Sequence, residues 1–195
     1  EELGIEVRTA YPWLVRDYDY AHAAVRLRFF KVTEWAGTPH GRENQLFTWQ
    51  RPGAITVDPM LPANGPILRA LGLPGEYAIT NAGDLGERLD RALAGGLKLL
   101  QVREKSMSGH ALLRFATEVV KRAHAAGARV LVNADEDQAR KAGADGVHLT
   151  SAQLRGPRPD CRLLGASCHD AAELELAQGL AVDFVVLGPV AATPS

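Results

Sequence analysis

The sequence has few cysteines and no long apolar run, and each of these absences excludes a class of protein. Two cysteines, Cys161 and Cys168, occur in 195 residues. They are too few for a disulfide framework and lack neighbouring metal ligands, so we expect reduced thiols that are buried or half-buried. No apolar run could span a bilayer, and residues 1–5 have neither the basic region nor the apolar core of a signal peptide. We therefore expect a cytoplasmic protein without a membrane partner.

A large net charge and an initiator methionine are also missing. The 22 Lys and Arg residues nearly balance the 23 Asp and Glu residues, which gives a formal net charge of −1. This balance gives no reason to expect a nucleic acid polymer as partner. The sequence begins at Glu1 and ends at Ser195, shortly after the apolar run 184–190. We expect this sequence to be a piece of a longer protein that is cut at both ends. That longer protein could form a homo-oligomer.

Aromatic residues become scarce along the chain, and this change predicts two domains. After residue 74 only Tyr77, Phe115 and Phe184 remain, whereas the earlier part is rich in Tyr, Trp and Phe. We expect a first domain over residues 1–73 and a second over residues 74–195. In the first, the spacing of apolar residues predicts strands over 23–33 and 47–50. A short helix is expected over 67–71, with Pro66 in its first turn.

The second domain alternates short apolar strands with amphipathic helices. The expected strands are 77–80, 97–103, 129–133, 146–149, 163–167 and 184–187, and the expected helices are 85–94, 111–125, 136–142 and 171–179. This rhythm predicts an α/β fold with a parallel sheet covered by helices. Similar helix-to-strand turns recur at 94–97, 142–146 and 179–183, as repeated β/α units would give. A complete TIM (β/α)8 barrel needs eight strands, and about six strands are expected here, so the sequence predicts an incomplete barrel.

Several motifs in the first domain have a familiar order and spacing. They are Glu1-Glu2-Leu3-Gly4-Ile5, Phe29-Phe30, Trp35-Ala36-Gly37, Gly41-Arg42-Glu43-Asn44-Gln45 and Leu61-Pro62-Ala63-Asn64-Gly65-Pro66-Ile67. Together they resemble the second half of MutT-type Nudix pyrophosphohydrolases. The resemblance implies a partial Nudix α/β/α sandwich that hydrolyses oxidised purine nucleoside triphosphates with Mg²⁺. Without the missing Nudix segment, this chain is expected to be inactive as a hydrolase.

The Nudix resemblance also assigns site residues. It places Glu1, Glu2 and Glu43 at the Mg²⁺ site, where carboxylate oxygens suit the metal. Asn64 falls on the asparagine that hydrogen-bonds the purine, since an amide can donate and accept at once. A helix N-cap is the alternative for Asn64. Trp35 and Trp49 are expected in the core rather than stacked on a ligand.

In the second domain, polar side chains follow the second expected strand. Alternation places Gln101, Arg103 and Lys105 on one side, at the carboxyl end where TIM barrels carry their active sites. Arginine, lysine and an amide together suit a pyrophosphate. A solvated basic loop is the alternative interpretation.

Further motifs of this domain resemble thiamine phosphate synthases and their TenI-type relatives. They are Tyr77-Ala78-Ile79-Thr80, Gln101-Val102-Arg103-Glu104-Lys105, Val132-Asn133, Gly143-Ala144-Asp145-Gly146-Val147-His148-Leu149, Gly165-Ala166-Ser167-Cys168-His169 and Leu187-Gly188-Pro189-Val190. The resemblance implies small-molecule thiamine precursors as ligands. By this resemblance the pyrimidine substrate and its pyrophosphate are bound by Gln101, Arg103, Lys105, Asn133, Ser167, Thr193 and Ser195.

Two histidines have more than one interpretation. His169 aligns with a histidine that TenI-type thiazole tautomerases use for proton transfer, a task that suits a group titrating near neutrality. Capping the next helix, or a hydrogen bond at a strand end, is the alternative for His169. His148 is expected to be structural.

Two departures from the synthase pattern concern the metal. The residue after Asn133 is Ala134, where synthases carry an aspartate, and a later metal aspartate falls on Gln153. Mg²⁺ then has no evident protein ligand unless Asp135 or Asp137 substitutes. We therefore keep three functions open for the second domain: a synthase-like enzyme, a TenI-type tautomerase, and a non-catalytic module that binds a thiamine precursor.

Overall fold

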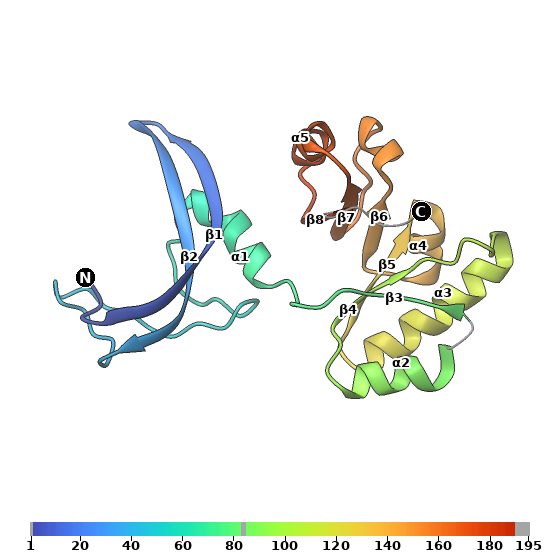
Figure 1. Ribbon diagram of the computed structural model, residues 1–195, viewed down its shortest axis with the longest axis horizontal. Helices are drawn as coiled ribbons and strands as arrows, with labels where there is room; N and C mark the ends of the chain where they lie inside the picture. Colours follow the sequence, from blue (N-terminus) through green and yellow to red (C-terminus); the bar gives the residue numbers. More distant parts are fainter. Residues whose placement is uncertain (1, 83–84, 190–195) are drawn as a thin grey trace. The chain divides into compact units, whose positions relative to one another are not determined.

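The computed structural model describes residues 2–82 and 85–189 (Figure 1). The chain divides into two compact units, Glu1–Gly72 and Leu73–Ser195, one residue away from the boundary expected from the sequence. The first is built on an antiparallel hairpin and the second on a parallel sheet.

The hairpin of the first unit joins two long strands, β1 (Glu6–Tyr20) and β2 (Ala23–Ala36). The 3₁₀ turn η1 (Pro62–Asn64) then leads directly into the helix α1 (Gly65–Leu71), which has a proline in its first turn. The alternating apolar residues of β2 predicted that strand correctly. No strand was expected over the residues of β1, because Pro12 interrupts their pattern. A register shift between Pro12 and Leu14 accommodates the proline in the hairpin.

Three expectations for the first unit were wrong. Residues 47–50 form no strand, and only an isolated bridge joins Arg51 to Ala54 nearby. Among the described residues of this unit, one hairpin and one α-helix are therefore present, and no α/β/α sandwich. Trp35 and Trp49 are 39% and 74% exposed and stack with ring centroids 6.3 Å apart, so they are not core residues.

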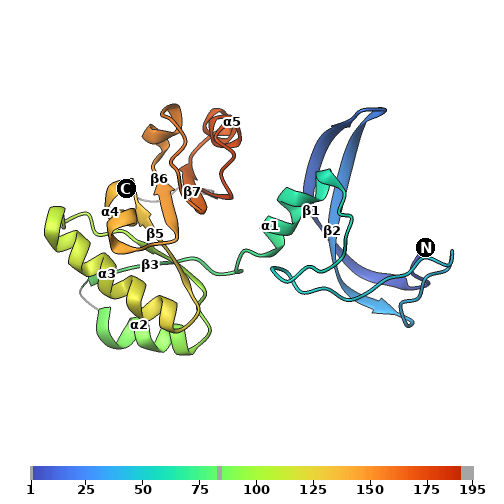
Figure 2. The same ribbon diagram turned by 180° about the vertical axis from the view of Figure 1, so that it is seen from behind.

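The second unit is a six-stranded parallel sheet in simple sequence order, β3 to β8 (Figures 1 and 2). Its strands are β3 (Ala78–Ile79), β4 (Leu99–Val102), β5 (Arg129–Asn133), β6 (Gly146–Leu149), β7 (Leu163–Cys168) and β8 (Phe184–Leu187). Its helices are α2 (Leu85–Ala94), α3 (Gly109–Ala125), α4 (Glu136–Ala142) and α5 (Ala171–Gly179), with a 3₁₀ turn η3 (Ser151–Arg155) after β6. Every expected strand and helix is present, and the incomplete barrel is confirmed. The turn η3 was not expected.

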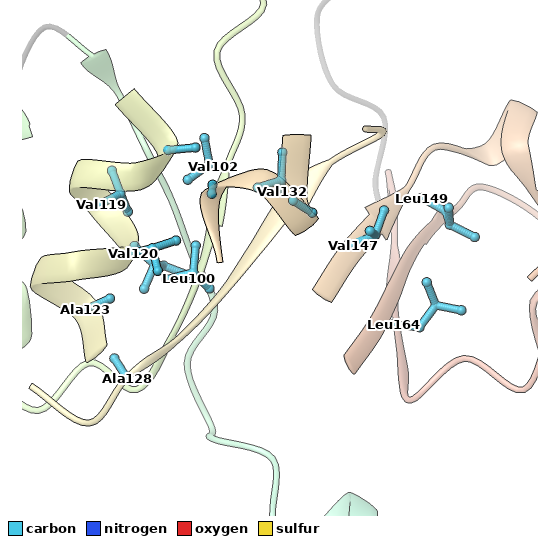
Figure 3. Close-up of a cluster of buried hydrophobic side chains, with 14 of the residues drawn as sticks. Leu100, Val102, Val119, Val120, Ala123, Ala128, Val132, Val147, Leu149 and Leu164 are labelled. Atoms are coloured by element: carbon cyan, nitrogen blue, oxygen red, sulfur yellow. The ribbon is translucent and has the colours of Figure 1, made fainter. Parts of the chain in front are cut away.

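The core of the second unit lies between the sheet and its helices. Leu100 and Val102 of β4 face Val119, Val120 and Ala123 of α3, as Figure 3 shows. The alternate residues of the strands point to the other, concave face, where a smaller apolar cluster is formed by Leu99, Leu131 and Leu163. Alternation along the strands thus separates a helix-covered apolar face from a concave face.

The recurring turn has a structural cause. The Asp145 carboxylate, just before β6, accepts a hydrogen bond from the backbone N–H of Val130 on β5 at 2.7 Å. The Asp183 carboxylate, just before β8, accepts from the N–H of Leu164 on β7 at 2.8 Å. In both places an aspartate in the turn connects a strand to the one before it, so the two repeats use the same device.

The first absences noted in the sequence are reflected in the structure. Cys168 is buried and Cys161 half-buried, and both are free thiols, which confirms the expectation. Burial raises the pKa of each thiol. Within the described ranges, no helix combines the length and apolar character needed to cross a membrane.

Candidate functional site

The concave face carries polar side chains at the carboxyl ends of its strands. Gln101 on β4 and Asn133 on β5 are neighbours, and the Gln101 Nε2 donates a hydrogen bond to Asn133 Oδ1 at 2.8 Å. Gln101 is only 3% exposed, although its side chain is polar. Because a buried amide must find partners, this bond fixes both amide groups in orientation. The structure thus brings together two residues that the sequence assigned to one site.

His148 on β6 and Ser167 on β7 continue this row. The two ring nitrogens of His148 contact different hydroxyl groups: Nδ1 lies 3.0 Å from the Tyr77 hydroxyl and Nε2 lies 3.0 Å from Ser167 Oγ. His148 is 2% exposed, which agrees with the structural role expected for it. Burial, together with the positive charge of Arg103, lowers the pKa of His148 to about 4. The imidazole is therefore neutral near neutral pH.

Gly165 makes room for this arrangement. A Cβ atom at residue 165 would lie 2.8 Å from His148 Nδ1 and 2.7 Å from the Phe184 ring. The Phe184 ring in turn packs edge-on against Tyr77, with centroids 5.0 Å apart. A side chain larger than hydrogen at this point of β7 would displace the histidine.

Arg103 and Lys105 follow β4 rather than belonging to it. The strand ends at Val102, so alternation does not place Lys105, which lies exposed in a turn. The Arg103 backbone is held because its N–H donates to Thr80 Oγ1 at 3.1 Å. Thr80 Oγ1 donates in turn to Glu104 Oε1 at 2.7 Å. These contacts fix the backbone while the Arg103 side chain stays exposed, close enough for its charge to act on His148.

His169 follows β7 and is paired with an acid that the sequence did not single out. The Glu173 Oε2 lies 2.9 Å from His169 Nδ1 and accepts the His169 backbone N–H at 2.7 Å. A carboxylate can only accept, so Nδ1 carries the hydrogen and Nε2 is the basic nitrogen. His169 does not cap helix α5, because Asp170 does so by accepting from Glu173 N. Glu173 could have been found from its spacing of four residues from His169.

The two residues that depart from the synthase pattern, Ala134 and Gln153, contact each other. Gln153 Nε2 donates to the carbonyl oxygen of Ala134 at 2.8 Å, and Gln153 Oε1 accepts from both the N–H and the hydroxyl of Thr150. Ala134 has a positive φ of 61°, an uncommon conformation for alanine. A methyl group and an amide N–H donor thus stand where synthases carry carboxylates.

The carboxylates nearby are engaged elsewhere. Asp135 accepts the Gln138 N–H and caps α4. Asp137 is paired with Lys141 and Arg140, whose hydrogen bonds hold its pKa below the usual range. No group of three or more His, Cys, Asp or Glu in residues 2–82 and 85–189 could hold a metal ion. An N–H donor facing a carbonyl does not suit Mg²⁺, so the residues present do not fit the metal.

The site residues expected in the first unit are brought together only in part. The Glu2 carbonyl accepts from Arg42 N at 3.0 Å and from Gln45 Nε2 at 2.9 Å, which places Glu2 beside the segment that carries Glu43. Asn64 precedes α1, but its side chain makes no capping bond and instead contacts Met60 Sδ at 3.5 Å. The N-cap alternative for its side chain is therefore wrong.

Three expected site residues, Glu1, Thr193 and Ser195, lie outside the described residues. Their roles stay predictions. The sequence indicated no role for Tyr77, yet its hydroxyl is part of the hydrogen-bonded row. Its position just before β3 was the available signal, because the residue leads into the first strand of the sheet.

The fold is an incomplete β/α barrel that carries polar side chains at the ends of its strands, the edge where such barrels carry their active sites. The comparison with known families then gives the class. The family model described as thiamine monophosphate synthase matches residues 76–195. The chain therefore belongs to the thiamine monophosphate synthase family. This match supports the second unit and says nothing of residues 1–75.

Individual relatives carry the same family description. The chain is 38% identical over 129 residues to a putative thiamine-phosphate synthase of Geobacter sulfurreducens, covering 61% of each protein. It is 35% identical over 154 residues to the thiamine-phosphate synthase of Mycobacterium sp. (strain JLS), covering 67% of this chain and 66% of that protein. The chain thus spans less than two thirds of the length of these relatives.

A solved structure shows the same fold. The thiamine phosphate pyrophosphorylase from Pyrococcus furiosus superposes with a TM-score of 0.50 at 24% identity, over 58% of this chain and 59% of that one. At this identity the likeness concerns the fold alone.

Proposed function

We propose that the second unit binds a phosphorylated thiamine precursor at the carboxyl edge of its sheet, as a thiamine-phosphate-synthase-like domain. The observation that carries the proposal is the buried bond from Gln101 to Asn133, beside the exposed cation of Arg103. Buried polar side chains are costly in an apolar core, so a row of them at strand ends indicates ligand recognition.

Each polar group has a chemical task in this proposal. The bond between the two amides leaves Gln101 Oε1 as an acceptor and Asn133 Nδ2 as a donor, which suits an aminopyrimidine. Arg103 offers a planar fork for a phosphate, and Lys105 a mobile charge. Ser167 adds a hydroxyl at the end of β7.

The proposed binding does not depend on Mg²⁺. The amide of Gln153 and the carbonyl of Ala134 satisfy each other, so phosphate charge must be balanced by Arg103 and Lys105. His169, oriented by Glu173, presents Nε2 for moving a proton on a bound thiazole, which supports a tautomerase-like step. Binding without chemistry remains the alternative outcome.

Calorimetry on the natural protein tests this proposal. Hydroxymethylpyrimidine pyrophosphate and thiazole phosphate are each titrated with and without Mg²⁺, and we expect similar affinity in both conditions. Arg103→Ala should weaken binding about 10- to 100-fold, the effect of losing a charge-assisted hydrogen bond. Arg114→Ala, on the exposed side of α3, is the matched control. Strictly metal-dependent binding, or no binding of either ligand, would overturn the proposal.

A second function is proposed for the first unit, where one observation favours a nucleotide site. A pocket of about 470 Å³ is lined by Leu3, Ile5, Val32, Trp35, Pro39, Phe47, Thr48 and Trp49. Exposed, stacked tryptophans beside such a pocket suit a flat purine base. The hydrogen bond from Arg42 to the Glu2 carbonyl brings the proposed Mg²⁺ ligands Glu2 and Glu43 onto adjoining segments.

The hydrolase hypothesis is tested in the natural protein with an oxidised purine triphosphate. Mg²⁺-dependent release of pyrophosphate should be abolished by Glu2→Gln and unaffected by Glu6→Gln, which changes an exposed residue of β1. Unchanged turnover in Glu2→Gln would contradict the metal assignment. Absence of any turnover in the unaltered protein would contradict the Nudix function itself.

A further inference from the structure

Tyr77, His148 and Ser167 form a continuous chain of hydrogen bonds across the concave face. The Tyr77 hydroxyl lies 3.0 Å from His148 Nδ1, and His148 Nε2 lies 3.0 Å from Ser167 Oγ. The tyrosine and histidine rings stack at an interplanar angle of 29°. The edge of Phe184 closes against Tyr77. Packing on several sides therefore holds the histidine ring in one orientation.

The chain of hydrogen bonds must have a direction. Burial and the charge of Arg103 keep the pKa of His148 near 4, and burial raises the pKa of Tyr77 well above its usual value. Both groups are neutral at pH 7. A neutral imidazole has one N–H donor and one acceptor nitrogen, so it must donate to one hydroxyl and accept from the other.

The tyrosine decides which direction is favoured. Within the described part of the chain, the Tyr77 hydroxyl has no other hydrogen-bond partner than His148 Nδ1. If Nδ1 carried the hydrogen, the phenol hydrogen would be left without an acceptor in a largely buried place, which is costly. Tyr77 therefore donates to Nδ1. The Nε2–H of His148 then donates to Ser167 Oγ. Neither of the two hydrogen bonds in this series uses the hydroxyl hydrogen of Ser167.

We propose that His148 is a positioning residue that, together with Tyr77, holds Ser167 as a hydrogen-bond donor for an oxyanion at the sheet edge. The identity of that anion, a phosphate group of a thiamine precursor, rests on the proposed function. With the opposite tautomer, Ser167 would donate to His148 and turn its lone pairs towards the anion, which would repel it. The protein thus selects for a phosphate oxygen without adding a charge.

The tautomer of His148 can be measured directly. ¹⁵N chemical shifts of the ring in the natural protein should show hydrogen on Nε2 and none on Nδ1. Tyr77→Phe removes the donor to Nδ1, so a mixture of both tautomers is expected. Tyr18→Phe, a change in the first unit, is the control and should leave the ring signals unchanged. A ring with hydrogen on Nδ1, or one that Tyr77→Phe leaves unaltered, would overturn the inference.

Ligand affinity gives a second, separate test with thiazole phosphate as the probe. Ser167→Ala should weaken binding about tenfold, the usual effect of one lost bond to an anion. His148→Met should match that loss, whereas His148→Gln keeps an acceptor and a donor and should stay within about threefold. Equal losses in His148→Met and His148→Gln would contradict a positioning role. If the unaltered protein binds no phosphate, the proposed function fails, and the tautomer measurement alone decides the inference.

Discussion

The two units handle their apolar residues in opposite ways. Nearly all the buried apolar residues of the described chain belong to the second unit, and only Ala63 and Ile67 come from the first. The first unit leaves large side chains in solvent, such as Val15 at 65% and Trp49 at 74% exposure. Both units are rich in apolar residues, so composition does not explain the difference.

Topology explains it. In the second unit α3, α4 and α5 pack on strands that are close to them in sequence, so these β/α repeats bury their own apolar faces. A two-stranded hairpin offers two faces and has no layer to cover them, and such a ribbon is at best marginally stable alone. The β/α repeats therefore stabilise themselves locally, whereas β1 and β2 require further contacts.

The largest effect is expected in the helix-covered core. Leu164→Ala should destabilise the second unit by about 2 to 5 kcal/mol, because it removes a fully buried side chain and leaves a cavity. Val15→Ala on the hairpin should change stability by no more than about 0.5 kcal/mol. Urea unfolding is monitored by hydrogen exchange of β5 to β7 for the second unit and by tryptophan fluorescence for the first unit. The two probes report the stability of each unit separately. Comparable losses at both positions would refute the contrast.

Acid should weaken the second unit through His148. Its folded pKa of about 4 lies below the ordinary value of 6.5, so the unfolded chain binds the proton more readily. The stability contributed by this group is complete above pH 6.5 and is lost as the pH falls towards 4. The total loss is about 3 kcal/mol. The urea midpoint should fall less steeply with decreasing pH in His148→Gln than in the unaltered protein. The same pH dependence in both proteins would exclude His148 as the cause of the acid destabilisation.

Glycine substitutions give a smaller effect with an internal control. Gly165→Ala forces a Cβ against His148 and Phe184 and should cost about 1 to 3 kcal/mol. Gly179→Ala, at the end of α5, meets nothing within 4 Å and should be neutral or stabilise by about 0.4 to 1 kcal/mol. Thermal unfolding of the two variants makes the comparison. Two variants of equal stability would show that the packing around His148 can relax.

The sequence predicted the second unit better than the first for physical reasons. Helices α2, α4 and α5 have the bounds that apolar spacing and end signals indicate, since local β/α repeats depend on near neighbours. The hairpin depends on pairing along its whole length and on an irregularity at Pro12, and alternation alone could not show the first strand.

The same distinction applies to the candidate site. Gln101 and Asn133 were assigned to one site from motifs at successive strand ends, and the structure joins them. The bond between Gln153 and Ala134 and the chain through Tyr77 connect residues up to 71 positions apart in sequence. Such contacts depend on side-chain orientation in the folded sheet, which spacing along the chain does not encode.

The smallest effect compares one helix start in each unit. Asp135 accepts the Gln138 N–H at the start of α4, so Asp135→Ala should cost about 1 kcal/mol. Asn64 occupies the corresponding position before α1 but makes no capping bond, so Asn64→Ala should cost only a few tenths, about 0.3 kcal/mol. Amide exchange of α4 and α1 in the two variants gives the local free energies. At a helix start without a side-chain cap, water satisfies the free backbone N–H groups. A large loss of stability in Asn64→Ala would therefore show that the Asn64 side chain does stabilise α1. The first unit would then be better organised at this helix than its exposed hairpin indicates.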